Sequence, residues 1–182
     1  FKDKGIDIIF TREPGGTPIG ERIRSIILDR DCAEMDDMTE AMLYAAARAQ
    51  HVVQVIRPAL LAGKIVICDR FVDSSIAYQG YGRGLGEAVS VINDYAVCGC
   101  LPDVTFLMKM DPRVGRRRIN VQQQDRLERE KDDFHVRTYE GYLELEKKYP
   151  GRIVGIDAAR SIEEIKIDIY KKLEEVLKGV TE

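Results

Sequence analysis

Four short runs of almost uninterrupted apolar residues constrain the fold of this chain most strongly. They are IDIIF (6–10), KIVICD (64–69), DVTFLMKM (103–110) and RIVGID (152–157). Runs of this length and composition are typical of strands that are buried on both faces. Helical patterns lie between and after them, at 18–29, 38–63, 86–99, 112–122, 132–149 and 161–179. Strands that alternate with helices predict an α/β fold, a parallel sheet flanked by helices.

Several residues mark where these elements begin and end. Thr39 is the predicted N-cap of the long helix over 38–63, and Gly63 is its predicted stop. Ser161 and Glu164 have the spacing of a capping box at the start of the last helix. The sequence GYGRG (80–84) is interpreted as a turn.

Length and composition narrow the class of protein. A chain of 182 residues predicts a single domain over 1–182. The net charge of −3 gives no overall attraction to nucleic acid or to an anionic membrane, and no apolar run is long enough to span a bilayer. The four cysteines include one close pair, Cys98 and Cys100, which without a second pair or a nearby histidine is a weak metal signal. We expect reduced thiols and a cytoplasmic location.

Polar residues follow the carboxyl ends of the first two runs, where ligands bind in parallel α/β sheets. Arg12, Glu13 and, later, Arg24 follow the first run, and Asp69 with Arg70 follows the second. The planar guanidinium group donates two parallel hydrogen bonds to phosphate, so three arginines favour a phosphate site. Asp69 could hold Mg²⁺. The alternatives are that each arginine pairs with a surface acid and that Asp69 caps a helix or pairs with Arg70.

A second group of residues could recognise a base. Tyr44 and Arg48 are four residues apart on the long helix and therefore share a face, so a ring and a guanidinium could stack on a base and bind its edge. Ser75 and Gln79 could bind a pyrimidine edge through a hydroxyl and an amide. On spacing alone, a core-edge aromatic next to a surface arginine is the favoured alternative for the helical pair.

Other chemistries lack support in this sequence. The chain contains no G-x-x-x-x-G-K-[ST] phosphate loop, and GYGRG lacks the G-x-G-x-x-G spacing of a dinucleotide site. His51 and His135 lie in helical patterns without a nucleophile beside them, so a catalytic triad is unsupported. The highly charged segment 116–133 is either a solvated helical hairpin or a mobile, arginine-bearing lid.

Taken together, the motifs resemble bacterial thymidylate kinase over essentially the whole chain. The matching segments are FTREPGGTPIGERIRSIIL, AMLYAAARAQH, DRFVDSSIAYQGYGRGLG, LPDVTFLMKMDPRVGRRR and DRLE. The resemblance implies a P-loop nucleoside monophosphate kinase fold with a helical lid at about 116–133, and a homodimer. It implies transfer of the γ-phosphoryl group of ATP to dTMP, giving dTDP for dTTP synthesis, with Mg²⁺.

The resemblance also implies roles for individual residues. The dTMP phosphate would be held by Arg12, Arg24 and Arg70, the thymine ring would stack on Tyr44, and the sugar would pack beside Tyr78. The base would be read by Arg48, Ser75 and Gln79, with Ser74 also in the dTMP site. Glu13 and Asp69 would lie near the metal and the reacting phosphates. ATP would contact Asp157, Ala158 and the lid arginines Arg118 and Arg126, either of which could serve the transferred phosphoryl group.

The sequence departs from the family pattern at its start and in two smaller places. The family's first strand and its phosphate loop have no counterpart, which predicts a gap in the sheet with unpaired strand edges, so we expect the native protein to have that segment. The lid stretch INVQQQ (119–124) is neutral, and Lys109 stands where relatives often have an acid. Another nucleoside monophosphate kinase, or an inactive dTMP-binding module, therefore remains an alternative function.

Overall fold

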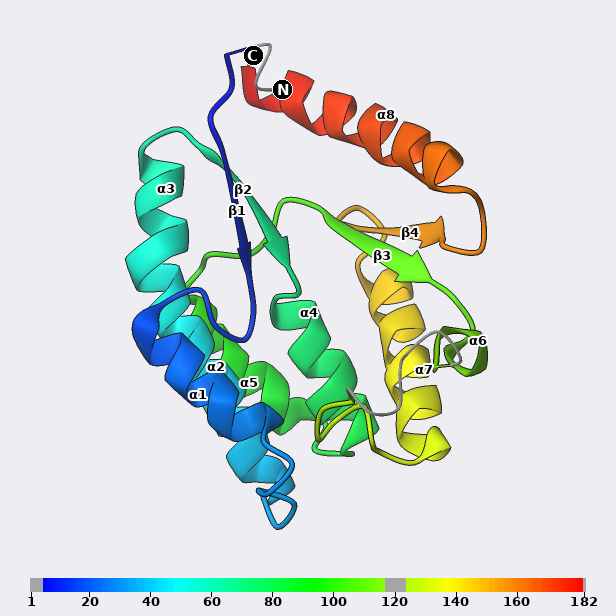
Figure 1. Ribbon diagram of the computed structural model, residues 1–182. Coiled ribbons are helices and arrows are strands. Elements are labelled where there is room, and N and C mark those ends of the chain that lie inside the picture. Colours follow the sequence, from blue (N-terminus) through cyan, green and yellow to red (C-terminus); the bar gives the residue numbers. More distant parts are fainter. Residues whose placement is uncertain (1–4, 117–123, 182) are drawn as a thin grey trace.

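The computed structural model describes residues 5–116 and 124–181, and its strands pair in parallel. Strand β1 (Ile8–Arg12) pairs with β2 (Ile65–Asp69), and β3 (Thr105–Lys109) pairs with β4 (Ile153–Asp157). Within the described residues these are two separate two-stranded sheets (Figure 1). The sequence predicted parallel strands and a gap in the sheet, and both are present in this part of the chain.

The helices connect and cover the strands. They are α1 (Pro18–Leu28), α2 (Asp37–His51), α3 (Arg57–Leu61), α4 (Val72–Ser75), α5 (Glu87–Val97), α6 (Pro112–Arg116), α7 (Asp132–Lys148) and α8 (Ile162–Thr181). The bounds of α1, α5, α7 and α8 are close to the predicted ones, whereas α4 was not predicted and the predicted helix over 38–63 is divided into α2, η2 (Val52–Ile56) and α3. Figure 1 shows α1, α2 and α5 grouped beside the β1–β2 pair, whereas α7 lies beside the β3–β4 pair. The α/β class predicted from the sequence is thereby confirmed.

Two apolar clusters hold together the elements that surround the pocket described below. One joins Ala77 and Leu107 to residues of α7 and β4, and the other joins Ile27 of α1 to Leu127 and Phe134. Tyr78 packs against both clusters. The segment that carries Leu127 is therefore packed directly on α1, although about a hundred residues separate them in sequence.

Two local predictions are wrong. The N-cap of α2 is Asp36, not Thr39, because the Asp36 carboxylate accepts hydrogen bonds from the backbone N–H groups of Met38 (2.9 Å) and Thr39 (3.3 Å). GYGRG is only partly a turn, since its first three residues close a π-helix, η3 (Ile76–Gly82). The long predicted helix is also interrupted by a π-helical segment, η2 (Val52–Ile56).

Other predicted ends are confirmed. Gly63 ends the α2–η2–α3 rod with a left-handed φ of 73°, a backbone conformation that glycine adopts without steric cost. The capping box is formed: the Ser161 N–H donates to Glu164 Oε2 at 3.0 Å, and the Glu164 N–H donates to Ser161 Oγ at 3.4 Å.

Candidate active site

A pocket lies beyond the carboxyl ends of β1 and β2, where the sequence predicted a ligand. Its wall is built from the loop after β1, from α1 and α2, from the α4–η3 segment and from part of the segment 124–135. Nine of the predicted site residues line it together: Glu13, Arg24, Tyr44, Arg48, Arg70, Ser74, Ser75, Tyr78 and Gln79. Arg12 and Asp69 are not among the residues that line this pocket.

The predicted phosphate-binding arginines approach the same loop. Arg12 and Arg24 both donate to the carbonyl oxygen of Pro14, at 3.1 and 3.0 Å. Arg12 also forms an ion pair with Glu21 at 3.0 Å, in which both side chains are about half-exposed (45% each). Arg70 follows β2 directly, and its guanidinium carbon lies 5.1 Å from the centre of the Tyr78 ring. The Arg70 backbone is left-handed, with a φ of 65°.

Beneath the pocket, a buried group of polar side chains surrounds Glu13. We call it the Glu13 cluster: Thr11, Glu13, Arg48, His51 and Asn93. Glu13 Oε2 accepts from Arg48 Nε at 2.7 Å, and Oε1 lies 2.9 Å from His51 Nδ1. Because a carboxylate oxygen accepts, His51 donates from Nδ1, and its Nε2 lies 2.7 Å from the hydroxyl oxygen of Thr11.

Arg48 is the centre of this cluster and not a surface residue. Its side chain is 1% exposed, and its Nη1 donates to Ser75 Oγ at 2.9 Å and to the Asn93 amide oxygen. Asn93 in turn donates to the Val89 carbonyl oxygen at 2.8 Å. The alternative of a surface arginine on α2 is therefore wrong. Arg48 still lines the pocket, so its role in reading a base stays a prediction.

The two acids predicted near the metal differ in availability. Both oxygens of Glu13 are engaged by Arg48 and His51, and the residue is 4% exposed. Asp69 is exposed, and its carboxylate makes no hydrogen bond or ion pair within the described residues, which leaves its oxygens open to Mg²⁺ or to metal-bound water. Among those residues no group of three or more His, Cys, Asp or Glu side chains forms a complete metal site. A magnesium ion here would thus depend on other oxygens, such as those of phosphate.

The aromatic part of the pocket includes Tyr78 and Tyr44. The Tyr78 ring meets Phe134 and Tyr142 edge-on, with centroid distances of 6.0 and 6.3 Å. Burial, together with the nearby negative charge of Glu40, raises the pKa of Tyr44 well above its ordinary value. Tyr44 therefore stays a neutral phenol at physiological pH and presents a ring on which a base could stack.

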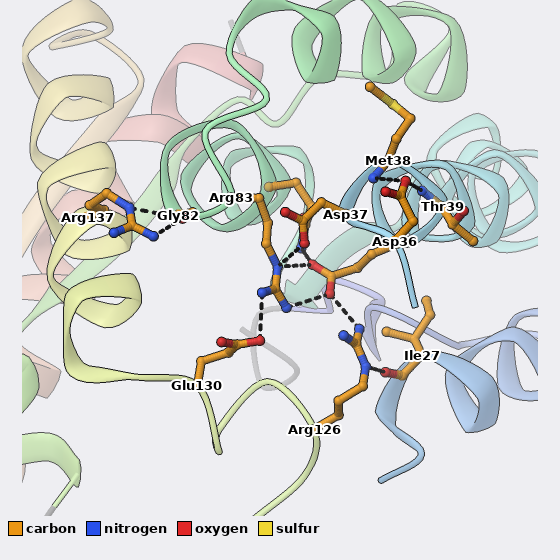
Figure 2. Close-up of polar contacts among 12 residues, drawn as sticks. Ile27, Asp36, Asp37, Met38, Thr39, Gly82, Arg83, Arg126, Glu130 and Arg137 are labelled. Carbon is orange, nitrogen blue, oxygen red and sulfur yellow. Dashed lines mark hydrogen bonds and ion pairs between the residues drawn. The ribbon is translucent and has the colours of Figure 1, made fainter. Parts of the chain in front are cut away.

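A second buried group, the Glu40 cluster, lies on the other side of the pocket: Glu40, Gln79, Arg83, Arg126 and Glu130. Glu40 is fully buried (0%) and accepts from Gln79 Nε2 at 2.8 Å, from Arg83 Nη2 at 2.9 Å and from Arg126 Nη2. Figure 2 shows Arg83 between Asp37 and Glu130, which lie 3.2 and 2.6 Å from its nitrogens. Burial opposes ionisation of Glu40, but the hydrogen bonds from Arg83, Gln79 and Arg126 outweigh it and lower its pKa.

This cluster changes the interpretation of Arg126, which was predicted to act from the lid. Its guanidinium pairs with Glu40 and donates through Nε to the Ile27 carbonyl oxygen at 2.9 Å (Figure 2). The residue is 8% exposed. In this conformation the Arg126 guanidinium binds the segment after residue 124 to α1 and α2. It is therefore not directed at a phosphate. The other candidate, Arg118, lies outside the described residues, as does most of the lid stretch INVQQQ.

The predicted ATP-contacting residues lie at the end of β4. Asp157 Oδ1 accepts from the Ala159 N–H at 2.9 Å, and the Ala158 N–H donates to the Lys109 carbonyl oxygen at 2.9 Å. A second hollow, lined by Asp157, Ala159 and residues of β3, α6 and α7, opens here. Lys109 forms an ion pair with Glu146 at 3.0 Å, so its charge is matched within the fold.

Sequence reasoning missed the acids and the histidine that complete the pocket. Asp125, Glu128 and His135 line it, while Glu40 supports it through its hydrogen bond with Gln79. One signal was available, because Glu40 lies four residues before Tyr44 and eight before Arg48, on the same face of α2. Nothing in the helical period indicated that Arg126, distant in sequence, would pair with it.

An α/β fold with paired parallel strands, and an arginine-lined pocket with a buried aromatic at their carboxyl ends, are features of proteins that bind phosphorylated ligands. The thymidylate kinase family model matches residues 1–169, and the chain belongs to this family. It is 49% identical over 181 residues to a thymidylate kinase of Halalkalibacterium halodurans, covering 97% of this chain and 86% of that protein. It is 50% identical over 171 residues to the thymidylate kinase of Pediococcus pentosaceus (92% and 82% covered), and 52% identical over 168 residues to that of Latilactobacillus sakei (90% and 78% covered).

Proposed function

We propose that this protein is a dTMP kinase, which transfers the γ-phosphoryl group of ATP to dTMP and releases dTDP and ADP. The observation that carries the proposal is the pocket itself, which combines Arg24 and Arg70 with a neutral Tyr44 ring and the Gln79 amide. Cations at one end and a stacking ring with an amide at the other suit a nucleoside monophosphate.

The proposed binding mode follows from the polarity of the pocket. The dTMP phosphate lies against Arg24 and Arg70, with Arg12 reaching it from the rim. The thymine stacks on Tyr44, and the deoxyribose packs beside Tyr78, whose ring is held by its aromatic neighbours. Ser74, Ser75, Arg48 and Gln79 bind the polar edges. Phosphoryl transfer depends on positioning and charge neutralisation more than on a strong base, and these residues supply the positioning of the acceptor.

Mg²⁺ bound with ATP supplies charge neutralisation at the transferring phosphates. Among the described residues, Asp69 fits such an ion, because its carboxylate is exposed and stands at the end of β2. Glu13 acts differently in this proposal: it holds Arg48 and His51 and shapes the floor of the pocket. The ATP side of the site includes Asp157, Ala158 and a lid at about 116–133, as in the P-loop nucleoside monophosphate kinase fold.

Coupled measurement of ADP release with dTMP, dUMP, UMP and CMP tests the function. We expect dTMP to be the preferred acceptor. Preference for UMP or CMP would point to a different monophosphate kinase. Tight dTMP binding without turnover, measured on the full natural chain, would support a dTMP-binding module instead.

Arg70→Ala tests the phosphate site. The variant removes a charged, bidentate donor from the pocket, so we expect the KM for dTMP to rise at least tenfold, and an unchanged KM would contradict the proposed position of the phosphate.

The homodimer predicted from the resemblance is also a proposal. Large apolar side chains are exposed on η2–α3 and on the neighbouring α5, among them Val53, Leu61, Val91 and Tyr95. A second copy could cover such a face. Light scattering after gel filtration should give the mass of a dimer, and Tyr95→Asp should shift it toward the monomer. A cytoplasmic location stays a prediction; within the described residues, no helix is long and apolar enough to cross a membrane.

A further inference from the structure

We infer that Glu40 is a positioning residue which sets the base preference of the pocket by fixing the orientation of the Gln79 amide. Glu40 does not line the pocket, and in the sequence it directly precedes the segment AMLYAAARAQH, which starts at residue 41. The inference rests on the proposed function, because it concerns how the same pocket selects a pyrimidine.

The first step concerns what Glu40 can accept. Its carboxylate is fully buried and is surrounded by donors: two guanidinium groups, from Arg83 and Arg126, and the Gln79 amide. With two cations beside it the carboxylate is ionised, and an ionised carboxylate has no proton to donate. The Gln79 group that faces Glu40 must therefore be the NH₂ group, as the 2.8 Å contact from Nε2 to Oε1 shows.

The second step concerns what Gln79 then offers to a ligand. With Nε2 committed to Glu40, the amide oxygen is the end of the Gln79 side chain that is left to accept from other partners. Gln79 lines the pocket beside Tyr44 and Ser75. The amide therefore presents a hydrogen-bond acceptor to the edge of a base that stacks on Tyr44.

An acceptor at this position discriminates between pyrimidines. Thymine and uracil carry a donor, N3–H, at the edge where neutral cytosine carries an acceptor, N3. A fixed acceptor in the pocket accepts a hydrogen bond from the N3–H of thymine or uracil. It forms no hydrogen bond with N3 of cytosine, because two acceptors then face and repel each other. A Gln79 amide that was free to turn would present its NH₂ group to cytosine equally well, so selectivity requires the buried carboxylate and not the glutamine alone.

Glu40 also fixes the wall opposite the base. Through Arg126 it holds the segment that contributes Asp125, Leu127 and Glu128 to the pocket, and the Arg126 N–H donates to the Leu28 carbonyl oxygen at 3.4 Å. One side chain thus determines both the chemistry of the amide and the position of the facing wall.

The test compares kcat/KM for dTMP and for dCMP in the wild type, in Glu40→Gln and in Arg83→Gln. Glu40→Gln keeps the shape but can either donate to or accept from Gln79, so we expect the dTMP preference over dCMP to fall at least tenfold. Arg83→Gln is the matched control: it removes a partner of Glu40 and lowers the melting temperature, but it leaves the Glu40–Gln79 contact, so the preference should be kept. An unchanged preference in a folded Glu40→Gln variant, or an equal loss in Arg83→Gln, would overturn the inference.

A charge-swapped variant covers the case in which Glu40→Gln does not fold. In Glu40→Gln/Gln79→Glu the buried pair is restored with its two members exchanged, and an acceptor again faces the pocket. The preference for dTMP over dCMP should therefore be higher in this variant than in Glu40→Gln. If Glu40→Gln does not fold, the comparison is with Gln79→Ala, whose preference should be lower than that of the exchanged variant. A swapped variant that folds and prefers dCMP would contradict the inference. Absence of dTMP turnover in the wild type would instead contradict the proposed function. This result is distinguishable from failure of the inference, because it is obtained on the wild type alone, before any variant is compared.

Discussion

The Glu13 cluster and the Glu40 cluster are both buried carboxylates with arginine partners, yet they are built in opposite ways. Glu13 comes from a loop and is held by Arg48 and His51 of α2, so the helix fixes the acid. Glu40 comes from α2 itself and holds Gln79, Arg83 and Arg126, so the acid fixes two other segments, η3 with its C-cap Arg83 and the segment that carries Arg126. The difference shows that both ends of one helix can position the residues of a pocket. Near its C-terminal end α2 binds the loop that carries Glu13, and near its N-terminal end it binds segments that are distant in sequence.

The comparison predicts unequal sensitivity to loss of an arginine, and the largest effect should come from Arg48→Met. This variant leaves Glu13 buried without its cationic partner, so the free energy of unfolding should fall by about 3–5 kcal/mol. Urea titration measures it. A loss below about 1 kcal/mol would mean that water reaches the Glu13 carboxylate in the variant at little cost.

Gly16→Ala should be the next most damaging change. Gly16 has a φ of 77°, and a Cβ atom there would lie 2.7 Å from Cδ2 and Nε2 of His51. Backbone strain and overpacking together should cost about 2–4 kcal/mol. Gly63→Ala is the matched control, since its φ is 73° but nothing lies within 4 Å of the added methyl group. Similar losses of melting temperature in both would show that the contact with His51 is unimportant.

Arg126→Met should cost less than Arg48→Met, because Glu40 keeps Arg83 and Gln79. We expect about 1.5–3 kcal/mol, the range for hydrogen bonds to a charged group. If instead the two arginine variants lost the same stability, the redundancy that distinguishes the Glu40 cluster would be refuted.

Acid should weaken the Glu40 cluster. The folded-state pKa of Glu40 lies below its ordinary value of 4.5, so its contribution is present above that value and is lost as the pH falls through the folded pKa. Unfolding free energies measured from pH 7 to pH 3 should decline less steeply in Glu40→Gln than in the wild type. A steeper decline in the variant would assign the acid sensitivity to other carboxylates.

Arg12→Met should have the smallest effect on stability. Its ion pair with Glu21 is half-exposed, so less than about 1 kcal/mol should be lost. The KM for dTMP should nevertheless rise if Arg12 reaches the phosphate. Loss of stability without a change in KM would place Arg12 among the residues that only shape the loop.

The parts of the structure that follow local rules could be predicted from the sequence. The strands were recognisable from continuous apolar runs, and the shared site of Arg24 and Arg70 was predicted from polar residues that follow strand ends. The place of Tyr44 in the same pocket was implied only by the family resemblance, because its spacing favoured a core-edge aromatic. The N-cap at Asp36 and the π-helical turn at Ile76–Gly82 were missed, because several residues compete for a cap and a π-helix has no strong pattern of its own.

The buried pairings could not be predicted in the same way. Arg126 and Glu40 meet through tertiary packing of Leu127 on Ile27, which no spacing in the sequence encodes. Arg126 was consequently predicted to contact ATP from the lid and not to pair with a buried acid. The same holds for Lys109, whose partner Glu146 lies on α7.

The left-handed backbone at Arg70 has a consequence for the stability of the molecule. A residue with a side chain at a φ of 65° costs roughly 1–2 kcal/mol relative to a relaxed backbone, and glycine would remove that cost. Arg70→Gly would also delete the guanidinium that faces the pocket. At this position, a substitution that relaxes the backbone also weakens ligand binding. A selection for heat resistance would therefore favour such a substitution, whereas a selection for growth, which depends on ligand binding, would remove it.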